Sequence, residues 1–369
     1  MKRWSIRQID TLRQKELSDA LHISPIIAQL LINRGLDRID KARTFLTGDV
    51  SELYDPFLMK GMPEAVRRIR QAIENKEKIL IHGDYDVDGV TAIVLLVVTL
   101  RNFGIKPDYY IPDRLTEGYG LGEKGVSEAI KIGADLVITV DCGISSYEEV
   151  ASLRAHNIDV IITDHHALPK LLPPAYTIIN PLQKDCAYPD ENLSGVSIAF
   201  KLCEAVCSSF NSKFIWGYLD LVSLGTVSDV APLVGENRIL VKEGFKLLKN
   251  GSSNKGIKAL LEICGLLNKE IGSFEIGFIL GPRINAIGRL GSAELACELL
   301  LADDTKEAEI LAKKLNEANR QRQRIESTTL KEAVSKIDSQ INFKDHKVIV
   351  LHSEDWHTGV IGIGIEALR

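Results

Sequence analysis

Hydrophobic residues recur at helical spacing in the first part of the chain, and from residue 78 onward short apolar runs replace them. Residues 17–35 follow the helical period and end on Gly35, a residue typical of helix C-caps, so residues 1–75 predict a helical segment. Runs typical of buried strands follow at residues 78–82, 135–140 and 158–163, with helical stretches near 89–103, 124–132 and 145–156. This alternation predicts an α/β fold with a mostly parallel sheet flanked by helices.

After residue 181 the pattern becomes mostly helical, with predicted helices at 194–210, 217–227, 238–249 and 256–263. A long polar helix is predicted from about residue 304 to about residue 337. Its apolar positions fall on one buried stripe: Ala308, Leu311, Leu315, Ala318 and Ile325. A new strand is predicted at residues 347–351. The pattern therefore predicts an N-terminal helical segment (1–75), a main α/β domain with a helical second part (76–303), a connecting helix (304–340) and the start of a further domain (341–369).

Composition narrows the class of protein. Hydrophobic residues make up 45% of the chain and charged residues 26%, as in globular proteins, and the longest apolar run, residues 93–100, is too short to span a membrane. The N-terminus lacks an export signal, and the six cysteines form no C-x-x-C pair, so we expect a cytoplasmic protein with reduced thiols. The net charge of −5 disfavours binding of nucleic acid by electrostatics alone.

Residues typical of metal sites follow all three predicted strands: HGDYDVDG at 82–89, VDCG at 140–143 and TDHH at 163–166. The carboxyl ends of parallel strands meet at one edge of a sheet, so we expect these clusters to converge. A calcium-binding EF-hand loop starting at Asp84 would need a glutamate at its twelfth position, which is Leu95. A packed, structural imidazole would explain His82 alone but not the whole set.

Carboxylate and imidazole ligands without thiolates favour Mn²⁺ or Mg²⁺ over zinc. Four carboxylates, those of Asp86, Asp88, Asp141 and the later Asp229, indicate two ions rather than one. Two such ions sharing a bridging carboxylate and water are the arrangement that supports in-line displacement at phosphorus.

Two further segments have the composition of substrate contacts. The glycine-rich segment 112–120 includes Arg114 and Tyr119, which could bind a phosphate and stack on a base, although an ordinary turn has the same composition. Segment 281–290 places Arg283 and Arg289 among apolar residues, where a phosphate or a structural ion pair would satisfy them. The arginines at positions 320, 322 and 324 are predicted to form a solvated helix face.

Six motifs, HGDYDVDG, PDRLTEGYG, TVDCGIS, TDHH, LGTVSDVAPL and GPRINAIGRLG, together resemble the DHH phosphoesterase superfamily and, within it, the bacterial RecJ family of single-strand-specific 5′→3′ DNA exonucleases. The similarity runs from about residue 10 to the last residue. It implies the metal ligands His82, Asp86, Asp88, Asp141 (bridging both ions), His165 and Asp229, with Asp220 fitting the fourth motif less well. It also implies that His166 and Arg283 meet the scissile phosphate and that Asp84 and Asp164 orient ligands. The residues it implies as nucleic-acid contacts are Arg114, Tyr119, Arg283 and Arg289.

The resemblance implies a metal-dependent exonuclease of DNA repair and recombination that uses two Mn²⁺ or Mg²⁺ ions and releases 5′-mononucleotides. Its expected partners are single-stranded DNA with a free 5′ end and a single-strand-binding protein or a helicase, with no membrane. Family members continue past the pattern at residues 356–363 into a full DHHA1 domain and an OB-fold, so we expect a C-terminally truncated catalytic portion. Two alternatives stay open: a phosphodiesterase for oligonucleotides or cyclic dinucleotides, and a non-catalytic, truncated single-strand-binding relative.

Overall fold

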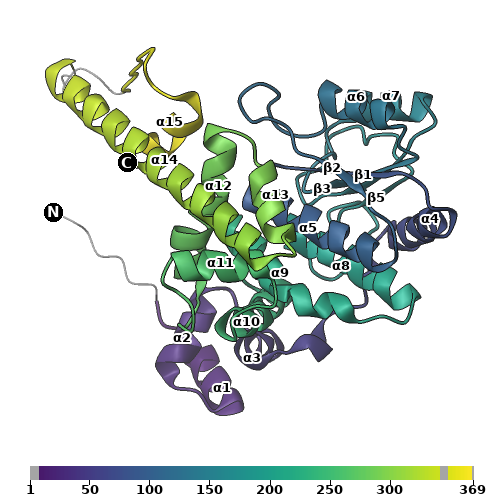
Figure 1. The fold of residues 1–369 in the computed structure, drawn as a ribbon. Helices are drawn as coiled ribbons and strands as arrows, with labels where there is room; N and C mark the ends of the chain where they lie inside the picture. The colour runs from purple at the N-terminus through teal and green to yellow at the C-terminus, as the bar shows by residue number, and fades with distance from the viewer. Residues whose placement is uncertain (1–7, 341–347, 368–369) are drawn as a thin grey trace.

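The centre of the molecule is a five-stranded sheet, seen in a computed structural model that describes residues 8–340 and 348–367 (Figure 1). The strands are β1 (Ile79–Gly83), β2 (Asp108–Tyr110), β3 (Leu136–Val140), β4 (Asp159–Thr163) and β5 (Thr177–Ile179), in the order β2-β1-β3-β4-β5 with every pair parallel. The predicted α/β class and the three predicted strands are confirmed. Strands β2 and β5 were not predicted, because three residues are too few to show a period.

Helices cover both faces of the sheet (Figure 1). On one face α6 (Glu123–Ile132) and α7 (Tyr147–Ala155) pack over strand residues that include Leu80 and Val137. The other face, which includes Ile81 and Ile138, packs against α4 (Met62–Asn75), α5 (Val87–Asn102) and α8 (Gly195–Ser209). Helix α5 is buried almost all round, which explains its continuous apolar run.

The second half of the domain is helical, as predicted. It contains η3 (Phe214–Tyr218), α9 (Leu219–Ser228), α10 (Gly235–Lys249), α11 (Lys255–Ile263), the π-helix η4 (Glu275–Leu280), α12 (Gly281–Leu290) and α13 (Glu294–Leu301). Helix α9 packs against both α5 and α8, so its C-terminal end lies close to the helix starts beside the sheet. None of the described helices is long and apolar enough to cross a membrane.

The N-terminal helical segment is confirmed but is divided into shorter helices. Its described part, residues 8–75, comprises α1 (Thr11–Leu21), α2 (Pro25–Asn33), α3 (Ile39–Thr47), two 3₁₀ turns, η1 (Val50–Glu52) and η2 (Pro56–Leu58), and α4. The predicted helix at 17–35 breaks because His22 is left-handed and Ser24 starts a new helix, with Pro25 in its first turn. A small core that includes Leu17 and Leu31 packs against Val234, which precedes α10.

The long helix is α14 (Thr305–Gln340), and it runs along α11, α12 and α13 (Figure 1). Ala308, Leu311 and Leu315 are buried as predicted. Farther along, polar residues occupy the buried stripe, among them Asn319 and Arg322. The prediction that position 322 is solvated is wrong, because α12 packs against α14 there; Arg320 and Arg324 do face solvent.

The predicted strand at 347–351 is wrong for its described part. Residues 348–351 form no strand, Val348 and Val350 are 73% and 80% exposed, and no described strand lies beside them to complete a hydrogen-bond ladder. Residue 347 lies outside the described residues. The chain then forms α15 (Thr358–Ala367), which packs against α14. The boundaries of the four predicted segments stay a prediction.

Candidate metal centre

The three motif clusters meet at the carboxyl ends of adjacent strands, as the sequence predicts. Gly83 at the end of β1 pairs with Val140 of β3, and Val140 pairs with Thr163 of β4. The next residues along these three strands are therefore Asp84, Asp141 and Asp164 at one edge of the sheet. Asp86 then caps α5 by accepting hydrogen bonds from the backbone of residues 88 and 89.

Asp88 is completely buried and is held by the start of α8. Its two carboxylate oxygens accept hydrogen bonds from Gly195 N (2.7 Å) and Val196 N (2.9 Å). The ligand atoms of Asp88, His165 and Asp229 all lie within 4.8 Å of one another. Burial, followed by the nearby Asp229 carboxylate, raises the pKa of Asp88 well above its usual range. These charges are therefore crowded together in a site that favours a cation.

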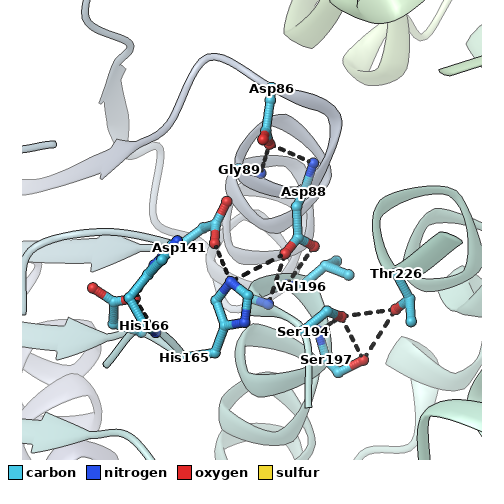
Figure 2. A network of polar contacts seen from close by, with 12 residues as sticks. Asp86, Asp88, Gly89, Asp141, His165, His166, Ser194, Val196, Ser197 and Thr226 are labelled. Atoms are coloured by element: carbon cyan, nitrogen blue, oxygen red, sulfur yellow. Dashed lines mark hydrogen bonds and ion pairs between the residues drawn. The ribbon is translucent and has the colours of Figure 1, made fainter. Parts of the chain in front are cut away.

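Asp141 lies between this group and a second one. Its backbone is left-handed (φ 57°), a conformation that is uncommon for residues other than glycine and is concentrated at functional sites. One carboxylate oxygen lies 3.1 Å from His165 Nε2 (Figure 2). Ligand atoms of Asp84, Asp86 and Asp141 form a set within 4.8 Å, and so do those of Asp141, His165 and His166. Asp141 and His165 thus connect the acidic groups.

Several buried polar atoms at this point have no hydrogen-bond partner. Asp84 Oδ1 is one of them, and Asp141 Oδ1 and His165 Nε2 form no hydrogen bond although they lie 3.1 Å apart. Burial and then His166 lower the pKa of His165 to about 4, so its imidazole is neutral, the form that binds metals. Unpartnered buried oxygens and a neutral imidazole nitrogen are costly to bury without a ligand. The residues present therefore fit divalent cations, which these atoms would coordinate.

Hydrogen bonds to neighbouring residues orient His166, which is more exposed than the carboxylates of the metal centre. Its Nδ1 lies 2.7 Å from Asp164 Oδ1, and this hydrogen bond raises the pKa of His166. Asp164 also accepts hydrogen bonds from the backbone N–H groups of Ile144 and His166. The Tyr119 hydroxyl lies 3.1 Å from His166 Nδ1 and donates to the Asp141 carbonyl. His166 is half-exposed, so part of its ring is accessible to a ligand.

His82 lies outside these groups, although the sequence predicts it as a metal ligand. Its ring is completely buried, stacks on Tyr110, and has Nε2 3.2 Å from the Gly120 carbonyl. Burial lowers the pKa of His82 to about 4, and its Nδ1 has no hydrogen-bond partner. Asp84, predicted only to orient ligands, instead shares a possible ligand set with Asp86 and Asp141.

Arg114 lies near both Asp84 and Arg289. The Arg114 guanidinium lies 4.9 Å from the centre of the Tyr85 ring, and Arg289 donates to the Gly359 carbonyl. Burial, followed by the nearby charges of Arg114 and Arg322, lowers the pKa of Arg289. These arginines are therefore close enough together to repel one another, which favours an anionic ligand.

The predicted phosphate contact Arg283 is engaged within the protein. Its guanidinium donates to Asn316 Oδ1 and to the Ile279 carbonyl, and none of its described hydrogen bonds reaches the acidic residues. Asp220, the weaker candidate in the fourth motif, is buried beside Ser252 and belongs to none of the described metal-type groups, unlike Asp229.

Known proteins resemble the chain closely. The model of the DHH family, N-terminal domain, matches residues 78–226. Over 98% of its length the chain is 40% identical to the single-stranded-DNA-specific exonuclease RecJ of Bacillus subtilis and 36% identical to that of Thermus thermophilus. A crystal structure of exonuclease RecJ bound to manganese matches with 38% identity and a TM-score of 0.76 over 84% of this chain and 77% of that one.

The chain belongs to the RecJ family of DHH proteins. It spans 45% of the length of the Bacillus subtilis relative and 51% of the Thermus thermophilus one. The structure of Thermus thermophilus RecJ in complex with Mn²⁺ matches 98% of this chain and 51% of that chain, with a TM-score of 0.83 and 34% identity. The fold and its place in the RecJ family are thus shown, whereas the site residues are assigned from this chain's own geometry.

Sequence reasoning missed one part of this RecJ-family site, the backbone N–H groups of Gly195 and Val196 that hold Asp88. A signal was present, since Ser194 precedes an apolar run and is a residue typical of helix N-caps. The sequence did not show that this helix start would face an aspartate that lies 107 positions earlier in the chain.

Proposed function

We propose that this chain is the catalytic part of a metal-dependent, single-strand-specific 5′→3′ DNA exonuclease that releases 5′-mononucleotides. The observation that supports this most is the pair of acidic groups, Asp88–His165–Asp229 and Asp84–Asp86–Asp141, connected by a third group that shares a residue with each. Two carboxylate-rich sites side by side are typical of two-metal phosphodiester hydrolysis. The metals of this proposal are Mn²⁺ or Mg²⁺, because the ligands are oxygen and imidazole without thiolate.

The residues have distinct roles in this proposal. Asp88, His165 and Asp229 would hold one ion, and Asp84, Asp86 and Asp141 the other; His82 would support the loop at Gly120. Ions bound there lower the pKa of a coordinated water and neutralise phosphate oxygens. His166, fixed by Asp164 and Tyr119, would donate a hydrogen bond to the scissile phosphate.

The DNA strand would approach the metal centre from the side of Arg114 and Arg289. Arg114 and Arg289 would bind backbone phosphates, and the half-exposed ring of Tyr119 is available for a base. Arg283 stays a predicted phosphate contact; its Nη2 makes none of the described hydrogen bonds. The substrate is then single-stranded DNA with a free 5′ end. A helicase or a single-strand-binding protein would present it during DNA repair and recombination in the cytoplasm.

The test is hydrolysis by the 369-residue chain, in Mn²⁺ or Mg²⁺, of long single-stranded DNA with a 5′ phosphate. We expect 5′-mononucleotides from the single strand and far fewer from the same DNA as a blunt duplex. Asp141→Asn is the negative control, since it removes one charge from the residue that belongs to two of the three groups. Absence of mononucleotides from every substrate would contradict the proposal.

The same panel includes a dinucleotide and a cyclic dinucleotide, because the RecJ resemblance leaves those substrates open. Hydrolysis of the short substrates alone would favour the phosphodiesterase alternative. Binding of single-stranded DNA without hydrolysis would favour the non-catalytic, strand-binding alternative, and a two-site Mn²⁺ isotherm in calorimetry would count against it.

A further inference from the structure

Three buried hydroxyl groups lie directly behind the proposed metal centre. Ser194 Oγ is 2.9 Å from Ser197 Oγ and 2.8 Å from Thr226 Oγ1, and the last two atoms are 3.1 Å apart (Figure 2). All three residues are completely buried. We call Ser194, Ser197 and Thr226 the hydroxyl triad. It is formed by two residues at the start of α8 and one residue near the end of α9.

The direction of each hydrogen bond in the triad can be derived from the Asn237 side chain, which accepts the last of them. Ser197 Oγ donates to Asn237 Oδ1 (3.0 Å), and that amide's nitrogen donates to the carbonyls of Asn192 and Pro232. Because each hydroxyl has one hydrogen, Ser194 donates to Ser197, and Thr226 donates to Ser194. The result is a single chain of hydrogen bonds from Thr226 to Asn237, in which Thr226 is the member contributed by α9, so removing its hydroxyl breaks the link from α9 to the start of α8.

The triad is connected to two predicted metal ligands, to Asp88 through α8 and to Asp229 through α9. Ser194 caps α8, and the first two N–H groups of that helix donate to Asp88. On the other side, Thr226 lies one turn before Asp229, whose backbone N–H donates to the Gly225 carbonyl at 2.9 Å. The triad therefore joins the helix start that holds one ligand to the helix end that carries the other.

Helices α8 and α9 cannot move closer together here. A Cβ atom added to Gly225 of α9 would lie 2.7 Å from Val196 Cγ1 of α8 and 2.8 Å from Asp88 Oδ1, so α9 already packs closely against the start of α8 and the buried carboxylate. Contact sets the shortest separation, and the triad's hydrogen bonds oppose a longer one. The spacing between Asp88 and Asp229 is thus limited from both sides.

We propose that the hydroxyl triad is a positioning device that fixes the spacing of Asp88 and Asp229, with Thr226 as its decisive member. This inference rests on the proposed metal centre. Thr226 touches neither metal nor substrate and acts through the two helices. Its loss changes the affinity of the Asp88–His165–Asp229 site more than it changes the overall fold.

The experiment compares Mn²⁺ binding by wild-type chain, Thr226→Val, Thr226→Ser and Thr99→Val, using calorimetry and the electron paramagnetic resonance of bound Mn²⁺. Val keeps the size of Thr and removes the hydroxyl, while Ser keeps the hydroxyl. Thr99 is the matched control, a buried threonine on α5 whose hydroxyl donates to the backbone carbonyl of Leu95. We expect Thr226→Val to weaken one of two Mn²⁺ sites by about 10–100-fold, the range seen for residues that support ligands.

We expect Thr226→Ser and Thr99→Val to bind Mn²⁺ like the wild-type chain. If Thr226→Val bound both ions normally while its melting temperature fell, the triad would be structural only and the inference would be wrong. If Thr226→Val failed to fold, Ser197→Ala would replace it, with weaker binding at one site expected and unchanged binding overturning the inference.

The result does not depend on nuclease activity. A wild-type chain that binds two Mn²⁺ ions but releases no mononucleotide would contradict the exonuclease proposal and leave this inference to be decided by the variants. A wild-type chain that binds no Mn²⁺ would overturn both.

Discussion

Two of the groups of buried charged residues in the described part of this domain differ in how their charges are compensated. In the metal centre, Asp88 and Asp141 lie close to further carboxylates and to a neutral His165, and Oδ1 of Asp84 and of Asp141 accepts no hydrogen bond. In the second group, the buried ammonium of Lys201 on α8 faces Glu236 on α10, with Nζ 2.8 Å from Oε1. We call this second group the Lys201–Glu236 pair.

The Lys201–Glu236 pair is completed by neighbouring hydrogen bonds. Lys201 also donates to the Tyr54 carbonyl at 2.9 Å, and Glu236 accepts hydrogen bonds from the Tyr54 N–H and the Tyr188 hydroxyl. Both charges are compensated without any ligand, as buried ion pairs must be to persist.

The difference shows how a binding site can be told from a structural polar network. Buried charge of one sign with unpartnered atoms needs an external counter-charge, whereas a matched pair only joins parts of the fold. This contrast favours a ligand at the metal centre and a stabilising role for the Lys201–Glu236 pair. The following changes test it, in order of decreasing effect.

The largest effect is expected from removing one member of the matched pair. Lys201→Met leaves Glu236 charged, buried and without its partner, which should lower the free energy of unfolding by about 3–5 kcal/mol. Urea unfolding measures this. Lys249→Met removes an exposed lysine from its contact with Glu270 and should change it by less than about 1 kcal/mol. If both variants lost the same free energy of unfolding, the buried Lys201–Glu236 pair would contribute no more to stability than an exposed ion pair.

At the metal centre, replacement should affect function rather than stability. Asp229→Asn removes a charge from the Asp88–His165–Asp229 group, and we expect exonuclease activity to fall by more than about 100-fold, the upper end for residues that merely support ligands. The matched control is Asp220→Asn, a buried aspartate that contacts Ser252. It should keep its activity. Loss of activity only in Asp220→Asn would show that the fourth motif had been assigned to the wrong aspartate.

Binding of Mn²⁺ to the Asp88–His165–Asp229 group should stabilise the folded chain. Mn²⁺ at ten times its dissociation constant should raise the free energy of unfolding by about 1.4 kcal/mol, because the native state alone assembles the ligands. Thermal unfolding with and without Mn²⁺ measures this. The shift should persist in Lys249→Met and shrink in Asp88→Asn. A shift of the same size in both variants would indicate that Mn²⁺ binds elsewhere.

The sequence was informative where local patterns decide the structure. The apolar runs ending near Gly83, Val140 and Thr163 predicted the central strands, and parallel pairing was enough to bring their motifs together. Features set by distant packing could not be predicted. The burial of Arg322 depends on α12 packing against α14, and the placement of His82 depends on the carbonyl of Gly120.

The smallest effect concerns backbone strain beside the metal centre. Val230, directly after Asp229, is 86% exposed and left-handed (φ 59°), a rare conformation for a β-branched residue. Val230→Gly removes the steric cost but adds chain entropy to the unfolded state, so we expect a gain of at most about 1 kcal/mol in urea unfolding. Val334→Gly, a change within helix α14, should instead lose about 0.5–1 kcal/mol. Destabilisation of similar size in both variants would show that the turn after Asp229 is unstrained, and the metal centre would then differ from the Lys201–Glu236 pair in charge alone.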